Sequence, residues 1–441
     1  LSMITKIKLG SAAGCALMAC NCISAHADFL TDGKADISAR NLYFDNDWRS
    51  GNARPSQNRE WGQGFILRYA SGFTEGALGF GVDANLMLGV TLDSGKGRHY
   101  ASSMFPDDGD RAADYWTRFE PTMKVRLQKT ELRYGALTPK LPVLTITDGR
   151  LLPQSFEGLQ VTSNDLDNAT IIGGQLTSAT ARGSSDSTGL SVAGASQDTN
   201  KFLFGGVDYR VGKDLTAQYY FGHLEDFYTQ HFLGLLHRLP MGQVGSLTSD
   251  LRYFSTRSDG KNSSATGRAE GYGTSGYTSG TNGEIDNNTW SATFTYSLGA
   301  HSFLMGYQSV SDDSNFIQPN QGGLVGKGSG GAGVYLYTDR LIQNFIRAGE
   351  DTTYVQYGYD FAALGIPGLK AALMYLDGRG IKTAAGSDQT EWERDLSIDY
   401  IVPSGALKGV GFGWRNGRSH SEASRDADQN RLIVSYTLAL F

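Results

Sequence analysis

Residues 79–93, which read GFGVDANLMLGVTLD, decide the fold class of this chain. Every second residue is apolar, and the residues between them are mostly small or polar. The apolar set is Phe80, Val82, Ala84, Leu86, Leu88, Val90 and Leu92. A period of two places these side chains on one face of a β-strand. A strand of a membrane barrel needs about 9–11 residues with lipid on one face and water on the other, so the stretch predicts a transmembrane strand.

The same alternation recurs in four later segments, residues 290–297, 355–361, 395–402 and 431–440. Short connections largely alternate with long ones, which is typical of outer-membrane barrels with short periplasmic turns and long extracellular loops. The predicted long connections are residues 45–61, 94–121, 139–168, 256–288, 311–349, 378–391 and 416–429. We therefore predict an all-β fold, a transmembrane antiparallel β-barrel of about 18 strands, with 16 strands as the alternative count. A large soluble β protein is the remaining alternative.

The composition excludes several other classes of protein. The chain has 441 residues, of which 57 are glycine, well above the usual share of about 7%. Its mean hydropathy is −0.31, and no uncharged apolar run of about 20 residues follows the first 30 positions, which argues against a helical membrane bundle. The formal net charge of −6 argues against a general nucleic-acid binder.

Residues 1–27 have the layout of a secretory signal peptide. Lys6 and Lys8 precede a mostly apolar stretch, which ends in the small-residue pattern Ala25-His26-Ala27. We expect cleavage after Ala27 and a single barrel domain over residues 28–441. An alternative is a lipoprotein box at residues 17–20, which would make Cys20 a lipidated N-terminus. All three cysteines lie within residues 1–27, so the predicted barrel contains no disulfide.

Motifs for catalysis and cofactor binding are weak in this sequence. Residues 326–331 match G-x-G-x-x-G, but they lie in a glycine-rich loop without the strand and helix that a dinucleotide site requires. The seven histidines show no metal-ligand spacing. The sequence therefore predicts no enzyme, no cofactor and no metal site.

Several arginines fall on the inward parity of their predicted strands. Arg415 and Arg431 alternate with apolar outward residues, and Arg126 and Arg133 have the same parity in their strands. Charges on the lipid face cost roughly 2–4 kcal/mol near the membrane midplane, so a lumenal position is favoured. Each arginine has two open interpretations: it can attract an anionic solute, or it can pair with a lumenal carboxylate.

Seven ordered segments carry a family resemblance. They are residues 39–44 (ARNLYF), 60–98, 129–164, 228–254, 365–369 (GIPGL), 391–395 (EWERD) and 430–436 (NRLIVSY). The chain resembles the OprD family of substrate-specific outer-membrane porins, also called the Occ channels, of Pseudomonas-type bacteria. The resemblance implies an 18-stranded pore that is constricted by inward-folded loops. It also implies a track of basic residues that guides carboxylate-bearing solutes.

The resemblance assigns Arg150 to the constriction, and Arg415 and Arg431 to the basic track. The chain also departs from the family pattern. Residues 337–347 differ and bring in Arg340, while Met374 and Asp399 stand where some members have basic residues. These departures argue against the acidic pocket that accompanies basic amino acid substrates in the family.

Together these observations predict an outer-membrane porin for passive, selective diffusion of small carboxylate-bearing solutes, with aromatic or small organic acids preferred. The predicted pore and substrate-track residues are Arg150, Arg415, Arg431, Arg126, Arg133 and Arg340. The alternatives are a porin of the same family for basic amino acids or peptides, and a barrel enzyme of the outer membrane. We expect solutes, outer-membrane lipid and lipopolysaccharide as partners, no nucleic acid, and a monomer or weak trimer.

Overall fold

The computed structural model describes residues 32–52, 56–94, 97–99, 103–109, 111–280, 282–319, 322 and 333–441. The predicted signal peptide and Cys20 lie outside the described residues. Within the described residues, the helices are single short turns, and none is long and apolar enough to cross a membrane. These turns are η1 (Gly242–Val244), η2 (Gly260–Ser263), α2 (Ala265–Gly267), η3 (Arg268–Tyr272) and η4 (Phe361–Leu364).

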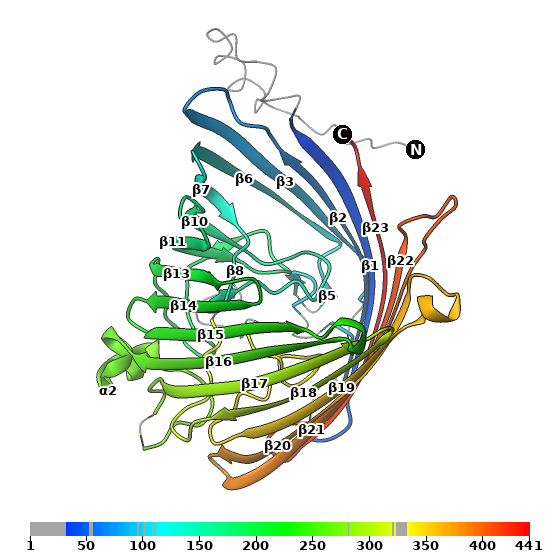
Figure 1. Cartoon of the computed structure of the whole chain (residues 1–441). Helices are drawn as coiled ribbons and strands as arrows, with labels where there is room; N and C mark the ends of the chain where they lie inside the picture. Colours follow the sequence, from blue (N-terminus) through cyan, green and yellow to red (C-terminus); the bar gives the residue numbers. More distant parts are fainter. Residues whose placement is uncertain are drawn as a thin grey trace, which may run out of the picture.

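Among the described residues, eighteen antiparallel strands close into one barrel (Figure 1). They are β1 (Lys34–Trp48), β2 (Gln57–Ala70), β3 (Leu78–Asp93), β6 (Tyr115–Leu127), β7 (Thr130–Leu137), β10 (Ser155–Ser163), β11 (Ala169–Thr180), β13 (Phe202–Val211), β14 (Leu215–Leu224), β15 (Tyr228–Pro240), β16 (Ser246–Ser258), β17 (Asp286–Leu298), β18 (His301–Val310), β19 (Asp351–Asp360), β20 (Leu369–Thr383), β21 (Gly386–Ile401), β22 (Gly411–Ser421) and β23 (Ala427–Ala439). Strand β1 closes the ring, because Asn41 pairs with Gln63 of β2 on one side and with Val434 of β23 on the other. The predicted fold and strand number are confirmed.

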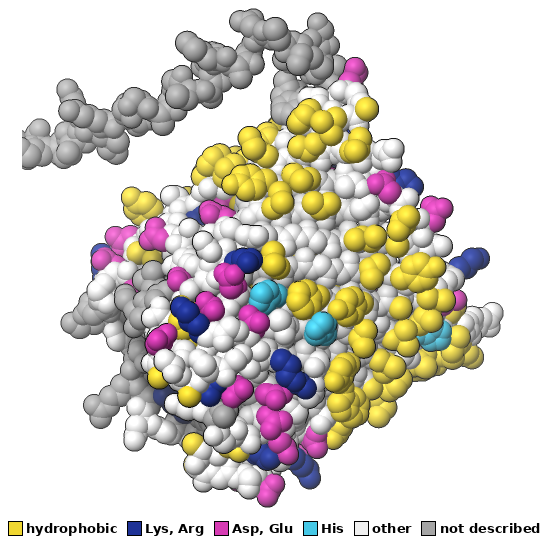
Figure 2. All heavy atoms as spheres, turned by 90° about the vertical axis from the view of Figure 1, so that its left-hand side faces the viewer, with side chains coloured by type: hydrophobic (Ala, Val, Ile, Leu, Met, Phe, Trp, Pro, Cys, Tyr) yellow, Lys and Arg dark blue, Asp and Glu magenta, His cyan; other side chains and the backbone are white. Residues whose placement is uncertain are grey.

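The alternation of side chains follows the sequence prediction. In β3, Phe80 and Leu86 are 51% and 50% exposed on the outer face, whereas Met87 is 2% exposed and points inward. Hydrophobic side chains gather in a broad band on the surface in Figure 2, and many charged side chains gather beside it. The apolar face of each strand therefore meets lipid, as the period of two requires.

Five of the predicted long connections are wrong in their extent, and two of them, 45–61 and 94–121, take in strand residues of β1, β2 and β6. The segment 139–168 contains β10, and only residues 138–154 form the inward connection. The segments 378–391 and 416–429 are mostly paired strand, with β20 running to Thr383 and β21 starting at Gly386. Polar residues occupy both faces of the β20–β21 hairpin around residues 378–391, so this segment lacks the alternation of apolar and polar residues by which strands were predicted. The connection 181–201 was not predicted as a long one.

The connections that enter the lumen pack against the barrel wall through three apolar clusters. They carry the short strands β4 (Asp107–Asp108), β5 (Arg111–Ala112), β8 (Lys140–Leu141), β9 (Leu144–Thr145) and β12 (Ser187–Thr188). The largest cluster joins inward aromatic residues of β13–β16, such as Phe232 and Phe254, to Val143 and Phe316 of the connections. A second cluster joins Phe44 of β1 to residues of β2, β3 and two connections, and a third surrounds Phe345. Part of the lumen is therefore dry, and the polar passage runs between these clusters.

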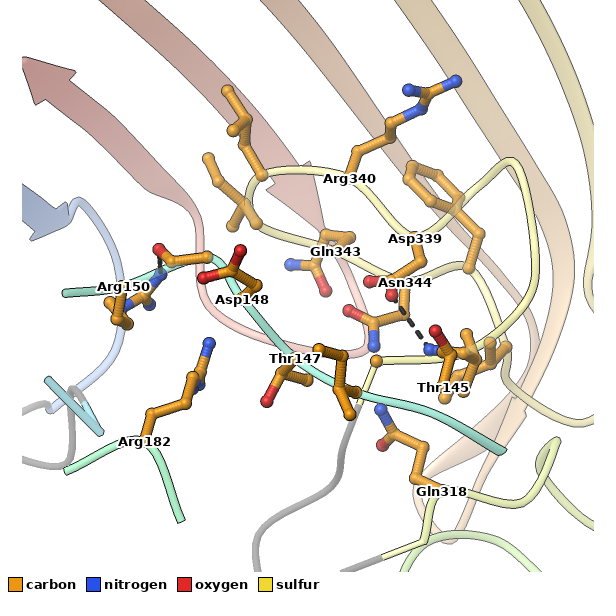
Figure 3. A pocket seen from close by; sticks show the side chains of 18 of the residues that line it. Thr145, Thr147, Asp148, Arg150, Arg182, Gln318, Asp339, Arg340, Gln343 and Asn344 are labelled. Atoms are coloured by element: carbon orange, nitrogen blue, oxygen red, sulfur yellow. Dashed lines mark hydrogen bonds between the residues drawn. The ribbon is translucent and has the colours of Figure 1, made fainter. Parts of the chain in front are cut away.

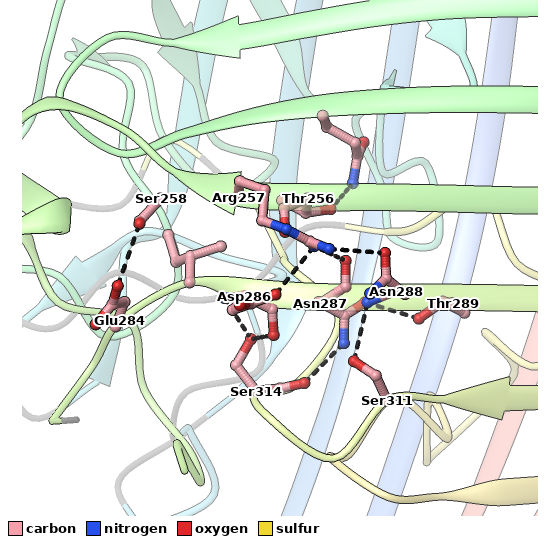
Figure 4. A network of polar contacts seen from close by, with 12 residues as sticks. Thr256, Arg257, Ser258, Glu284, Asp286, Asn287, Asn288, Thr289, Ser311 and Ser314 are labelled. Atoms are coloured by element: carbon pink, nitrogen blue, oxygen red, sulfur yellow. Dashed lines mark hydrogen bonds and ion pairs between the residues drawn. The ribbon is translucent and has the colours of Figure 1, made fainter. Parts of the chain in front are cut away.

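Polar contacts fix the start of the connection between β18 and β19 against the start of β17 (Figure 4). The Asn287 side chain donates to the Ser314 carbonyl at 2.7 Å, and the Asn288 backbone N–H donates to the Ser311 hydroxyl at 2.9 Å. Beside them, Arg257 of β16 pairs with Asp286, the first residue of β17, at 2.9 Å. These bonds satisfy backbone and amide groups that would otherwise be buried without partners.

The lipid-facing assignment predicts that Leu86→Arg destabilises the barrel in lipid vesicles by about 2–4 kcal/mol, because it places a charge in hydrocarbon. Asn85→Arg is the matched control, since Asn85 faces the lumen and pairs in register with Glu120. Urea titration of both variants in vesicles measures the difference. Equal loss of stability in the two variants would contradict the assignment.

Candidate solute site at the pore constriction

A cavity of about 640 Å³ lies between the inward connections and the wall formed by β23. Its lining comes from residues 145–150 of one connection, from residues 315, 318, 333, 334 and 339–347 of another, and from Arg182 and Arg431. Figure 3 shows Arg150, Arg182 and Asp148 at one end of this cavity, with Gln318 and Asn344 toward the other. Segments that are distant in the sequence thus meet around one cavity inside the barrel.

Three arginines converge on Gly149 inside this cavity. A Cβ atom placed on Gly149 would lie 3.6 Å from Arg431 Nη1 and 3.7 Å from Arg182 Nη1. The guanidinium of Arg150 lies 4.3 Å from the centre of the Phe44 ring, and that of Arg431 lies 5.7 Å from the same ring. Contact with the π-system of one ring helps to hold these two cations in place.

Hydrogen bonds fix the orientation of this arginine cluster. Arg431 donates from Nε to Gln429 at 2.7 Å and from Nη2 to the Leu341 carbonyl at 2.8 Å. Arg40 pairs with Asp148 at 2.7 Å and also donates to the Arg150 carbonyl at 2.7 Å. The negative charge of Asp148 is therefore paired with Arg40, and Arg150, Arg182 and Arg431 place three guanidinium groups around Gly149.

Buried carboxylates of β21 hold the connection 311–350 in place. The Glu393 carboxylate, 0% exposed, accepts hydrogen bonds from the backbone N–H groups of Leu341, Ile342 and Gln343 at 3.1, 3.0 and 2.6 Å. Glu391 pairs with Arg347 and accepts from Ser421 Oγ at 2.7 Å. These two acids have structural partners, so they position the loop that lines the cavity.

The loop groups around the cavity titrate differently from free side chains. Burial raises the pKa of Asp339 to about 6, although its carboxylate accepts from the Val334 N–H at 3.0 Å and lies near Arg340. Burial, followed by the charge of Arg431, lowers the pKa of Arg182 to about 10. Burial and the neighbouring arginines also lower the pKa of Arg150. At neutral pH the guanidinium groups remain protonated, while Asp339 is near its titration range.

The structure brings together only some of the predicted track residues. Arg150 and Arg431 lie in the cluster, and Arg415 lies on the lumenal face as the register partner of Arg431. Arg415 pairs with Asp399 at 2.7 Å, so its charge is matched. The backbone of Arg340 lines the cavity, but its guanidinium is directed away in Figure 3.

Two other predicted arginines lie elsewhere in the lumen. Arg126 lies 4.2 Å from the centre of the Phe73 ring, near the short turn between β6 and β7. Arg133 pairs with Glu131 and with Asp83, the latter at 3.5 Å. Their inward parity is confirmed, but they do not contribute to the constriction.

Arg182 is the site residue that the sequence did not identify. It follows the end of β11, in the connection 181–201, whose Gly- and Ser-rich composition was a usable loop signal. At the adjacent Gly183 a Cβ would lie 2.9 Å from the Phe105 carbonyl oxygen, a contact that only the structure shows. The close approach of two connections at Gly183 carries Arg182 into the cavity.

A closed 18-stranded barrel with connections folded into its lumen around a charged cavity has the architecture of an outer-membrane porin. The chain belongs to the OprD family: the family model described as "outer membrane porin, OprD family" matches residues 27–440. The protein is accordingly an outer-membrane protein, and its relatives are channel proteins rather than enzymes. The predicted family and location are confirmed.

Three relatives show the extent of the similarity. The crystal structure of Pseudomonas aeruginosa OccK8 (OprE) is 49% identical, with a TM-score of 0.86, and the match covers 94% of this chain and 100% of that one. The crystal structure of Pseudomonas aeruginosa OpdK with vanillate is 35% identical, with a TM-score of 0.81 and coverage of 93% and 100%. The porin-like protein GalP of Pseudomonas putida is 32% identical over 93% of each chain.

The role of Glu393 predicts a local effect of Glu393→Ala. Loss of the carboxylate leaves one buried and two partly buried N–H groups without this acceptor, and hydrogen bonds to a charged group each contribute about 1.5–3 kcal/mol. Amide hydrogen exchange at Leu341, Ile342 and Gln343 should accelerate about a hundredfold. Asp399→Asn is the control, because Asp399 pairs with Arg415 and does not contact this loop. Unchanged protection at the three amides would refute the anchoring role.

The elevated pKa of Asp339 predicts a pH-dependent selectivity. Lowering the pH from about 7 to about 5 protonates most of this carboxylate and removes one negative charge from the cavity, so anion preference should rise. The reversal potential across a salt gradient measures this preference at each pH. In Asp339→Asn the preference should match the low-pH value at both pH values. A wild-type potential that does not change with pH would contradict the prediction.

Proposed function

We propose that this porin passes small carboxylate solutes, with aromatic or small organic acids preferred, and that Arg150, Arg182 and Arg431 bind the carboxylate at the constriction. One observation carries the proposal: the Nη1 atoms of Arg182 and Arg431 both lie within 3.7 Å of the Cβ position of Gly149. Because that position holds no side chain, an anion can approach both guanidinium groups.

The physical reason is the cost of moving a bare anion through a narrow, partly dry passage. Guanidinium groups replace part of the lost hydration through paired N–H donors that match a carboxylate. The arginines are already held by Phe44, Gln429 and the Leu341 carbonyl, so little side-chain entropy is lost when the solute arrives. Several weak sites allow the solute to leave again, which conduction requires.

A relative supports the aromatic preference. The solved structure of OpdK, 35% identical to this chain, is described with vanillate, which is an aromatic monocarboxylate. Ile342, which is partly exposed, also lines the cavity and offers apolar atoms to an aromatic ring.

The alternative is a preference for basic amino acids, which would require free carboxylates at the constriction. Glu391 and Glu393 instead bind Arg347 and the backbone of the loop. Asp148 is matched by Arg40, which leaves Asp339 as the carboxylate most available to a cationic solute at neutral pH. The balance of charge therefore favours anions.

The test uses Arg182→Gln and Arg431→Gln, alone and together, and measures the uptake of benzoate and of arginine into liposomes that contain the protein. We expect the double variant to lose carboxylate uptake about tenfold, as the loss of one or two charge-assisted hydrogen bonds implies, while arginine uptake does not fall. Arg126→Gln is the matched control, because it removes a lumenal arginine outside the cluster. Unchanged benzoate uptake in the double variant would show that these arginines are structural.

A further inference from the structure

The barrel wall has a notch between β6 and β10. In the described part of the chain, the ladder between β6 and β7 covers only Thr122–Leu127. Strand β7 ends at Leu137, and the chain then turns into the lumen (Figure 1). Residues 115–121 of β6 therefore have no strand partner on this side, although they pair with β3 on the other.

Two glycines, which have no side chain, and one proline, which has no N–H group, shape this notch. Pro121 stands where the ladder stops, and it has no N–H group to leave unpaired. Gly135 has φ +130°, and a Cβ there would lie 2.4 Å from the Pro121 carbonyl oxygen. A Cβ on Gly158 would lie 2.2 Å from the Gln175 carbonyl oxygen, at a register shift between β10 and β11. The opening is therefore a property of the local sequence.

The notch holds a cavity of about 430 Å³ with two different sides. On the outer side it is lined by apolar residues that face lipid, including Phe119 and Tyr134, which are 68% and 60% exposed, and Leu159. On the inner side it reaches the buried polar side chains of Glu120 and Ser155. A molecule that fits both sides is amphipathic.

Two carboxylates determine the charge of this cavity. Glu120 is 7% exposed; its Oε1 accepts from Ser155 Oγ at 2.6 Å and lies 3.5 Å from Arg118 Nη1. Its Oε2 is buried and has no hydrogen-bond partner among the described residues. Glu157 lies on the outer face of β10, where it accepts from Ser178 Oγ at 2.9 Å. Of the described residues that line the cavity, none is Lys, Arg or His.

We propose that this notch binds one cationic amphiphile from the membrane. Its ammonium group donates hydrogen bonds to Glu120 Oε2 and Glu157, and its hydrocarbon chain lies along Phe119, Tyr134 and Leu159. A carboxylate that faces lipid is costly unless a cation compensates it, and a buried acceptor without a donor adds to that cost. The ligand enters from the lipid side, so this site is separate from the proposed carboxylate passage.

The test uses the full chain in lipid vesicles with two photoactivatable probes of equal chain length, a benzophenone-tipped alkylammonium and a benzophenone-tipped alkyl sulfonate. Mass spectrometry of the digested protein locates the labelled peptides. We expect the ammonium probe to label β6, β7 and β10 about tenfold more than the sulfonate probe. Glu120→Gln with Glu157→Gln should lower the ammonium labelling to the sulfonate level.

Two further variants keep the test decisive. Glu131→Gln is the matched control, because Glu131 lies on the lumenal face of β7 and pairs with Arg133, so labelling should not change. Leu159→Trp fills the outer side of the notch and should block both probes. If Glu120→Gln fails to fold, Glu157→Gln alone must still lower the ammonium labelling, since its side chain lies outside the wall. Equal labelling by the two probes in the unaltered protein, or full ammonium labelling of folded Glu157→Gln, overturns the proposal.

Discussion

The closed ring of backbone hydrogen bonds is the constraint on which the rest of this structure depends. Inside a lipid bilayer no water is available to an unpaired N–H or C=O group, so a sheet spans it by closing into a ring that leaves few backbone groups unpaired. The pairing of β1 with β23 meets this requirement by joining the two ends of the described chain. Once the ring is closed, the alternation of side chains assigns every strand residue to lipid or to the lumen.

A barrel of this size encloses more space than a selective passage needs, and the inward connections fill it. Two kinds of contact hold them. Apolar residues such as Phe232, Phe254 and Phe316 bury part of the connections against the wall, while buried acids such as Glu393 bind their backbone N–H groups. Because these acids are already bonded to the protein, a chain with excess negative charge can present a cationic constriction. The whole-chain charge therefore does not predict the charge of the passage.

The arginine cluster and the notch in the wall arise from the same structural event. Strand β7 is short, and the chain that leaves it at Leu137 carries Asp148, Gly149 and Arg150 into the lumen. Its departure leaves β6 without a neighbour next to Pro121. The wall is therefore open beside Leu137, where the loop that lines the passage leaves the barrel wall.

The sequence by itself determined the properties that depend on local periodicity. The alternation in residues 79–93 and its later recurrences predicted the lipid face, the lumenal parity of Arg415 and Arg431, and the approximate strand number. Long matching segments identified the family. These features repeat along the chain with a fixed spacing, so no knowledge of distant contacts is needed to find them.

Only the tertiary structure decided which side chains meet. Arg182 joins Arg150 and Arg431 because two connections approach at Gly183, and no spacing in the sequence encodes that contact. The structure likewise separated Arg415, which is paired with Asp399, from the cluster around Gly149, and it placed the Arg340 guanidinium away from the cavity. Inward aromatic residues such as Phe232 have the parity of water-facing positions, and they become dry only when a loop packs on them. The physical reason is that a period of two reports the face of a strand, whereas the partner on that face depends on how distant segments fold over it.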